Sequence, residues 1–406
     1  MFLNFRGSGG GAFVGSVTVP PTGGIASKPG LVALMHDPWF GGFTNRKHHL
    51  TRLLADQKRL GRCLYVQRKP IPPQLVPEIL AATGVINTAA GCLIPVIDGR
   101  FHVFAPFEGV DIQAEDITPL LERMNLTDYF LLTQTPLLAD LAVALRPVAT
   151  VYDCTDDYST ILADRKEVVE RGDRLLLEQA DAVTTVSQAL HEQKTRLHQR
   201  VLMLPNGVDT EHFAIHDQPI PPDLESWNGR TIAGYVGRIN YKFDMALLRE
   251  VARMRPEIQF ILIGPITCDA TALARQPNVV LLGIRDYQLL PAYVKRFDLC
   301  VIPHLIGAIT HFMNPIKAYE YLAMGKPVVS TAIGGLEDIA SEVIIAESAA
   351  QFSAGIERAL EARSVSDTDR RRRLALGHTW NQRADRLSSL FEELTSHPGP
   401  TTVAQA

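Results

Sequence analysis

Short apolar runs rich in β-branched residues alternate with stretches of helix length along most of this chain, and this alternation constrains its fold more than any other feature. The first candidate strands are 31–35, 63–67, 129–134, 149–153, 182–187 and 201–205. A second series follows at 232–237, 259–264, 278–283, 298–303 and 326–331. Runs separated in this way are typical of parallel α/β units. We therefore predict an α/β protein with two series of parallel strands.

The segment between the two series of strands has the composition of a linker, with the run PIPPD at 219–223. The chain has 406 residues, of which 46% are hydrophobic and 21% charged, so it can bury two sizeable cores. We expect the following organisation: a flexible arm at 1–30, a first domain at 31–205, a linker at 206–230, a second domain at 231–378, a C-terminal helix at 379–396 and a disordered tail at 397–406.

Composition also excludes several classes of protein. No apolar run approaches the length that spans a bilayer, and no secretory signal pattern is present, so we expect a cytoplasmic protein. The five cysteines show no C-x-x-C spacing, which argues against a disulfide framework and a structural zinc site. The net charge of −4 gives no general attraction to nucleic acid.

The segment 314–331 predicts a helix followed by a short buried strand. Asn314 can cap the helix, and Pro315 suits its first position. Lys317 and Glu320 are three residues apart, so they share one face near the N-terminus, where free N–H groups and the helix dipole favour anions. This arrangement predicts a site for a phosphorylated ligand. An ordinary crossover helix with an exposed ion pair is the alternative.

The sequence of this segment, NPIKAYEYLAMGKPVVST, resembles the nucleotide-sugar signature of GT-B glycosyltransferases, in particular the retaining enzymes of bacterial family 4. The string PNGVD at 205–209 also resembles that family, and the resemblance covers about residues 31–395. It implies a GT-B fold, in which two Rossmann-like domains with parallel sheets face each other across a cleft and a C-terminal helix crosses back to the first domain.

By this resemblance, Glu320 accepts hydrogen bonds from the ribose of the nucleotide, and the residues before it lie near the diphosphate and the sugar. The expected donor-binding residues are therefore Gly237, Asn314, Pro315, Ile316, Lys317 and Glu320. Many family members carry another Glu eight positions before the one that matches Glu320. This chain has Phe312 there.

The second series of strands opens with GYVGRINYKFD, in which a strand ends at Gly237 and Arg238 and Lys242 follow in a loop. Ligands of open α/β sheets bind beyond the carboxyl ends of strands, so these two cations can neutralise an anion, although a plain surface loop is the alternative. The resemblance to a G-R-x-x-x-K-G pattern implies that they hold the donor diphosphate. Because negative charge develops there, Arg238 and Lys242 are predicted catalytic residues, and no metal ion is expected.

Three carboxylates follow the strand 149–153, from Asp153, Asp156 and Asp157. They could cap a turn, line a sugar or acceptor site, or bind a metal ion. A metal site is the weakest of these readings, because Mg²⁺ usually combines few carboxylates with substrate phosphates. The resemblance places a sugar-contacting His where this chain has Asp153, so Asp153 is a candidate catalytic residue and Asp156 a candidate substrate-binding residue.

The loop after the first strand contains Gly41 and Gly42, where the backbone can approach a ligand closely, and the resemblance puts this loop on the acceptor side. Both glycines are candidate substrate-binding residues. A basic segment at 46–69 follows, in which eight Lys or Arg side chains face a single acid, Asp56. It is either a solvated face or a surface for anionic lipid or a phosphorylated acceptor.

These features predict a retaining, metal-independent glycosyltransferase that needs no cofactor. It would move a sugar from a nucleoside-diphosphate sugar of the UDP or GDP type to a carbohydrate or lipid-linked acceptor, in bacterial surface polysaccharide assembly. Its expected partners are the donor and the acceptor, with peripheral contact to the anionic inner face of the cell membrane as a further hypothesis. Two alternatives stay open: a non-catalytic GT-B subunit that binds a partner glycosyltransferase, and a sugar-nucleotide epimerase.

Overall fold

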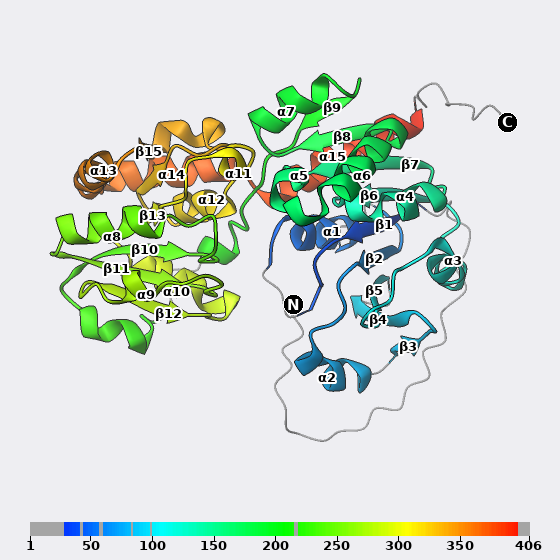
Figure 1. Ribbon diagram of the computed structural model, residues 1–406, viewed down its shortest axis with the longest axis horizontal. Coiled ribbons are helices and arrows are strands. Elements are labelled where there is room, and N and C mark those ends of the chain that lie inside the picture. The colour runs from blue at the N-terminus through cyan, green and yellow to red at the C-terminus, as the bar shows by residue number, and fades with distance from the viewer. Residues whose placement is uncertain are drawn as a thin grey trace.

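The computed structural model describes residues 28–40, 44–56, 60–82, 84–97, 100–214 and 218–396. The expectations for Gly41 and Gly42, for most of the N-terminal arm and for the C-terminal tail lie outside these residues. Figure 1 shows two lobes, each built around its own sheet, with the C-terminal helix drawn in red over the first lobe. No helix in the described ranges is both long enough and apolar enough to cross a membrane.

The first sheet joins nine strands within the described residues, in the order β3-β4-β5-β2-β1-β6-β7-β8-β9. Their bounds are β1 Gly30–Met35, β2 Cys63–Gln67, β3 Ile86–Asn87, β4 Gly91–Ile97, β5 Phe101–Pro106, β6 Tyr129–Thr133, β7 Ala149–Cys154, β8 Ala182–Thr185 and β9 Val201–Met203. From β5 to β9 neighbouring strands run parallel, whereas β4 is antiparallel to both of its neighbours.

The second sheet joins six strands of the described chain, all parallel to their neighbours, in the order β12-β11-β10-β13-β14-β15. Their bounds are β10 Thr231–Val236, β11 Ile258–Ile263, β12 Val279–Gly283, β13 Leu299–Ile302, β14 Val328–Thr331 and β15 Val343–Ala346. Every strand that the sequence predicted is present. The sequence missed β3, β4, β5 and β15, because β4 contains a proline and the others are short or lie outside the regular alternation.

Helices cover both faces of each sheet, which is why the central strands are continuously apolar. In the first domain they are α1 Arg46–Asp56, α2 Val76–Leu80, α3 Ala114–Arg123, α4 Ala139–Ala144, α5 Tyr158–Ile161, α6 Lys166–Gln179 and α7 Gln188–Thr195. In the second they are α8 Met245–Met254, α9 Thr271–Ala274, α10 Leu290–Arg296, α11 Ala308–His311, α12 Ile316–Ala323, α13 Ala349–Glu361 and α14 Val365–Leu376. The last helix is α15 Trp380–Ser396.

Alternate residues of β1 show how the layers form. Val32 and Leu34 join the core under α3, α4 and α6, whereas Leu31 and Ala33 join the core under α1 and α15. The C-terminal helix α15 thus completes a face of the first sheet, although it follows the second domain in sequence. The predicted return of this helix to the first domain is confirmed.

A buried ion pair anchors α1 to the first sheet. The guanidinium of Arg46 donates to both carboxylate oxygens of Asp153, with Nε–Oδ2 at 2.8 Å and Nη2–Oδ1 at 2.7 Å. Gln134 and Thr184 donate to the same carboxylate at 2.6 Å each. Burial alone raises the pKa of Asp153, but Arg46 and these hydrogen bonds bring the pKa below its usual value. The carboxylate is therefore ionised, and both of its oxygens accept hydrogen bonds from side chains of the first domain.

Asn206 extends this hydrogen-bond network to the second domain. Arg46 Nη1 donates to the Asn206 side-chain oxygen at 3.4 Å. Asn206 donates in turn to Asn314, from its backbone N–H to Oδ1 and from its Nδ2 to the backbone carbonyl, both at 2.7 Å. Asn314 Nδ2 then donates to the hydroxyl of Tyr319 at 3.0 Å. The chain from Arg46 to Tyr319 thus fixes the start of α12 relative to the first sheet.

Replacing Asp153 with Ala should lower the free energy of unfolding by about 3–5 kcal/mol, because Arg46 would stay buried without its counter-ion. Asp140→Ala is the matched control, since Asp140 and its partner Arg171 are 68% and 58% exposed. An exposed pair of this kind contributes only about 0–1 kcal/mol. Urea unfolding followed by circular dichroism measures both variants. Equal losses would show that the buried pair is no more important than the exposed one.

Candidate functional site

The helix α12 begins at Ile316 with Pro315 as its N-cap, and no side chain caps it. The prediction that Asn314 caps this helix is wrong, because its side chain is committed to Asn206, Tyr319 and the carbonyl of Gly335. Pro315 accordingly precedes the first turn and does not lie within it. The Ala318 N–H donates to the Pro315 carbonyl at 3.1 Å, and no side chain caps the turn, so the N–H groups of Ile316 and Lys317 are the ones that can bind an anion.

Lys317 and Glu320 share one face of α12, and both are partly buried. Within the described residues, neither side chain has a hydrogen bond to the protein. The Lys317 ammonium lies 5.2 Å from the centre of the Tyr235 ring, a cation–π contact. A β-carbon on Gly237 would lie 2.7 Å from Lys317 Cε, and Gly237 has φ of 152°. Glycine is therefore required where β10 ends against this helix.

Desolvation shifts the pKa values of both α12 side chains toward neutrality. Burial lowers the pKa of Lys317 to about 8, with Glu320 opposing the shift and the Lys242 cation adding to it. Burial raises the pKa of Glu320 to about 7, with Lys317 opposing. Each charge is thus costly where these side chains lie, and an anionic ligand beside Lys317 would stabilise its protonated form.

The loop after β10 presents two further cations. The Tyr235 hydroxyl donates to the backbone carbonyl of Arg238 at 2.9 Å, and the side chain of Arg238 is exposed. Leu305 donates its backbone N–H to the carbonyl of Lys242 at 2.8 Å. Phe243, which stands where the family has Gly, is buried and packs edge-on against Tyr235 at 5.0 Å. The packing of these two rings thus stabilises the loop that carries Arg238 and Lys242.

Lys242 reaches the first domain, where its Nζ lies 3.4 Å from Asp156 Oδ1. Their side chains are 17% and 30% exposed, so the pair is partly shielded from water. Asp156 follows β7, at the carboxyl edge of the first sheet. The predicted substrate-binding residue therefore faces a predicted diphosphate-binding residue across the domain boundary.

His304 is a site residue that the sequence analysis missed. It follows β13, is buried, and places Nε2 3.3 Å from the Tyr235 hydroxyl, whereas its Nδ1 has no hydrogen-bond partner. Burial lowers the pKa of His304 far below its usual value, and the Lys317 and Lys242 cations lower the pKa further. The imidazole is thus neutral. Its place directly after a predicted strand was the signal that could have found it.

The basic segment 46–69 does not form the open face that its composition suggested. Arg46 and Lys47 are buried, and Lys47 pairs with Asp37 at the end of β1. Lys69 pairs with the same carboxylate at 3.3 Å. Asp37 is a second residue that the sequence analysis missed. Two of the eight predicted surface bases therefore point into the first domain, and Lys58 and Arg59 lie outside the described residues.

The structure brings most of the predicted donor-site residues together at the carboxyl edge of the second sheet and the start of α12: Gly237, Arg238, Lys242, Asn314, Pro315, Ile316, Lys317 and Glu320. Asp153 is the exception. It is fully buried with its oxygens occupied by first-domain donors, so its placement argues against the catalytic role expected for it.

Phe312 and Ile316 contact the first domain. Phe312 packs against the first-domain core that Val32 and Leu34 join, and its carbonyl accepts a hydrogen bond from Ser187 at 2.8 Å. Ile316 packs against the core beneath α1 and α15. Where many family members carry a Glu, this chain thus uses an apolar side chain to join the domains.

Residues 230–362 match the family of glycosyl transferases group 1. The fold is that of sucrose-phosphate synthase (tll1590) from Thermosynechococcus elongatus, with a TM-score of 0.69 and 18% identity over 90% of this chain and 99% of that one. The chain thus has the GT-B fold, with two Rossmann-like domains, and its second domain is similar to the group 1 glycosyltransferases. The predicted fold class is confirmed.

Among particular relatives, the chain is 28% identical over 276 residues to TuaH of Bacillus subtilis (strain 168), which is named for a glycosyltransferase role in teichuronic acid biosynthesis. That match covers 61% of this chain and spans only 66% of the length of TuaH. Anabaena Alr3699/HepE, solved in complex with UDP-glucose, has a TM-score of 0.64 and 14% identity, covering 90% of this chain and 100% of that one.

The pKa values of Glu320 and Lys317 predict that a nucleotide sugar at this candidate site, with UDP-glucose as the probe, would bind most tightly between about pH 7 and pH 8. Below this window Glu320 is protonated and loses its acceptor charge, and above it Lys317 loses its positive charge. Glu320→Gln should remove the acid limb, and Lys317→Arg should remove the alkaline limb because guanidinium stays charged. Calorimetry from pH 6 to pH 8.8 measures the dissociation constants. An affinity that does not change with pH would contradict the assignment of these groups.

Removing the aromatic ring beneath Lys317 should change the pH dependence of the dissociation constant only on its alkaline side. Tyr235→Leu is expected to shift that limb down by roughly 0.4–1.5 pH units, the equivalent of a cation–π contact of about 0.5–2 kcal/mol. Tyr235→Phe keeps the ring and should keep the limb in place. The same calorimetric series tests both variants, and equal shifts would assign the effect to the lost hydroxyl.

Proposed function

We propose that this protein transfers a sugar from a nucleoside-diphosphate sugar to a carbohydrate or lipid-linked acceptor, with retention of configuration at the transferred carbon. The observation that carries the proposal is the grouping of Arg238, Lys242 and Lys317 beside the uncapped N-terminus of α12. Three cations and a helix N-terminus form a site for a diphosphate. Glu320 lies one turn further along α12, where its carboxylate can accept the ribose hydroxyls of the nucleotide.

The same groups would promote the reaction. The acceptor oxygen bonds to the sugar carbon, the glycosyl–phosphate bond breaks, and the hydroxyl proton passes to an oxygen of the departing diphosphate. Negative charge grows on that diphosphate, so cations held beside it stabilise the transition state more than the bound donor. We propose that Arg238, Lys242 and Lys317 supply this stabilisation without a metal ion.

The comparisons support the choice of donor and pathway. A UDP-sugar is our first choice and a GDP-sugar our second, because HepE was solved with UDP-glucose and has the same fold. Surface polysaccharide assembly is the proposed pathway, because TuaH is named for teichuronic acid biosynthesis. We propose domain bounds of 31–205 and 231–378, joined by the linker 206–230.

We also propose that the protein acts in the cytoplasm, at the inner face of the membrane. The support is the basic segment 46–69, which could contact anionic lipid. Because Arg46 and Lys47 point inward, this contact depends on the other bases of the segment and is a minor part of the proposal.

Arg238→Ala and Lys242→Ala should each lower kcat by about 10²–10³-fold while weakening UDP-glucose binding less, because the lost charge interacts most with the leaving diphosphate. Arg253→Ala, which removes an exposed cation from α8, is the control and should leave turnover unchanged. Release of UDP from UDP-glucose measures turnover, and it should survive EDTA. Activity that EDTA abolishes and Mg²⁺ restores would refute the metal-independent mechanism.

The presence of Phe312 favours a second candidate function, a non-catalytic GT-B subunit that binds a partner glycosyltransferase, because it replaces a polar family residue with a domain contact. A thermal-shift panel of UDP, GDP and dTDP, followed by assays for sugar release, separates the candidates. Stabilisation by one nucleotide together with sugar release supports the transferase, whereas a chain that binds none of them favours the subunit. Interconversion of the sugar nucleotide would instead indicate an epimerase.

A further inference from the structure

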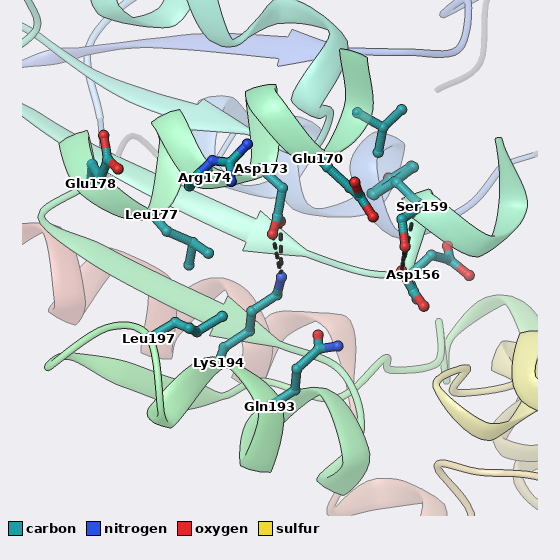
Figure 2. A pocket seen from close by; sticks show the side chains of 13 residues that line it. Asp156, Ser159, Glu170, Asp173, Arg174, Leu177, Glu178, Gln193, Lys194 and Leu197 are labelled. Atoms are coloured by element: carbon teal, nitrogen blue, oxygen red, sulfur yellow. Dashed lines mark hydrogen bonds and ion pairs between the residues drawn. The ribbon is translucent and has the colours of Figure 1, made fainter. Parts of the chain in front are cut away.

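A groove of about 540 Å³ runs along the first domain between α6 and α7. None of the residues assigned to the donor site lines it, whereas Asp156, the candidate substrate-binding residue, does. Its volume is within the range of about 300–1,000 Å³ that small-molecule sites occupy. Figure 2 shows Glu170, Asp173 and Glu178 on the α6 wall and Gln193 and Lys194 on the α7 wall. Asp156 closes the end of the groove that is nearest the second domain.

The position of Asp156 connects this groove to the proposed donor site. The same carboxylate that lines the groove lies 3.4 Å from Lys242, which we assign to the diphosphate. A molecule in the groove would therefore end beside the leaving group of a bound donor. This is where the attacking hydroxyl of an acceptor has to lie.

The two walls of the groove are joined by a rigid polar contact. Lys194 Nζ donates to both oxygens of Asp173 at 2.9 and 2.8 Å, and the hydroxyl of Tyr152 donates to the same carboxylate at 2.7 Å. Lys194 is only 5% exposed and Tyr152 is fully buried. This contact, drawn with dashed lines in Figure 2, holds the separation of α6 and α7. The groove is thus preorganised.

The charges of the groove are unbalanced. Asp173 neutralises Lys194 and Lys242 pairs with Asp156, so the carboxylates of Asp157, Glu170 and Glu178 face one remaining cation of the lining, Arg174. The contact of Glu170 with Lys166 outside the lining is an exposed pair, which water screens. Carboxylates accept hydrogen bonds from hydroxyl and amino groups and repel other acids. Leu177 and Leu197 add apolar surface, on which the faces of sugar rings can pack.

We propose that this groove is the acceptor site and that it binds a non-acidic carbohydrate, neutral or amino-bearing, and excludes acidic sugars. The inference rests on the proposed transferase function and adds the location and the chemical class of the acceptor. The field of the three carboxylates selects against uronic acids and sugar phosphates, and the apolar floor selects for a saccharide over a simple amine.

Three disaccharides serve as probes: neutral N,N′-diacetylchitobiose, cationic chitobiose and anionic digalacturonate. Each is titrated into the protein with saturating UDP and followed by ligand-observed NMR, and UDP release from UDP-glucose is measured in parallel. We expect binding and faster UDP release with the neutral or the cationic probe, and neither with the anionic one. Gln193→Trp should weaken that binding by about tenfold or more, because the indole fills the groove, with the dissociation constant of UDP unchanged.

Val168→Trp is the matched control, since Val168 lies on α6, is 51% exposed and does not line the groove. It should bind all three probes as the unmodified protein does. The double variant Glu170→Gln and Glu178→Gln should gain binding of digalacturonate, because it removes two of the repelling charges. This gain is a result that damage to the fold would not produce.

Binding of digalacturonate in preference to the other probes would overturn the charge class. Absence of binding by all three, or equal effects of the Trp at 193 and the Trp at 168, would overturn the assignment of the groove. Each of these outcomes is distinct from failure of the proposed function. If the proposed function fails, UDP does not bind and UDP-glucose is not cleaved, and this result does not depend on binding in the groove.

Discussion

The ion pair between Arg46 and Asp153 is the start of a hydrogen-bond network that links the two domains. It holds the first turn of α1 against the end of β7, and the remaining donor of the same guanidinium reaches Asn206. Asn206 then fixes Asn314, and with it the start of α12. A helix that presents Lys317 and Glu320 to a ligand is therefore aligned by a charge in the other domain. A fold of two separate sheets needs such a contact, because their cores are distinct.

The sequence predicted the parts of the structure that depend on local pattern. The buried strands have continuous apolar runs, and α12 carries Lys317 and Glu320 at helical spacing, so both could be read without coordinates. The roles of Asp153 and Asn314 could not, because they depend on partners that lie 107 and 108 residues away. A carboxylate at the end of a strand looks the same in a sequence whether it faces a ligand or a buried guanidinium.

Desolvation determines the electrostatic character of the donor site. Lys317 lies above the Tyr235 ring, and both Lys317 and Lys242 act on the neutral His304, so these positive charges lie close together. Burial brings the pKa values of Lys317 and Glu320 to about 8 and about 7. Charges held in this way interact strongly with a bound anion, because little water remains to screen them. The sequence showed which charges are present but not how far each is buried.

In the donor site that we propose, the Asp156–Lys242 pair would also affect which anions bind. Because Asp156 neutralises Lys242 at 3.4 Å, a single inorganic phosphate would have to displace a carboxylate that is already in place. A nucleoside diphosphate can offset that cost through its ribose and its second phosphate, whereas a simple anion cannot. Asp156 would thus compete with an incoming anion for Lys242, so only a ligand with enough further contacts would displace it. In a cell rich in phosphate, such competition would keep the proposed site available for the larger ligand.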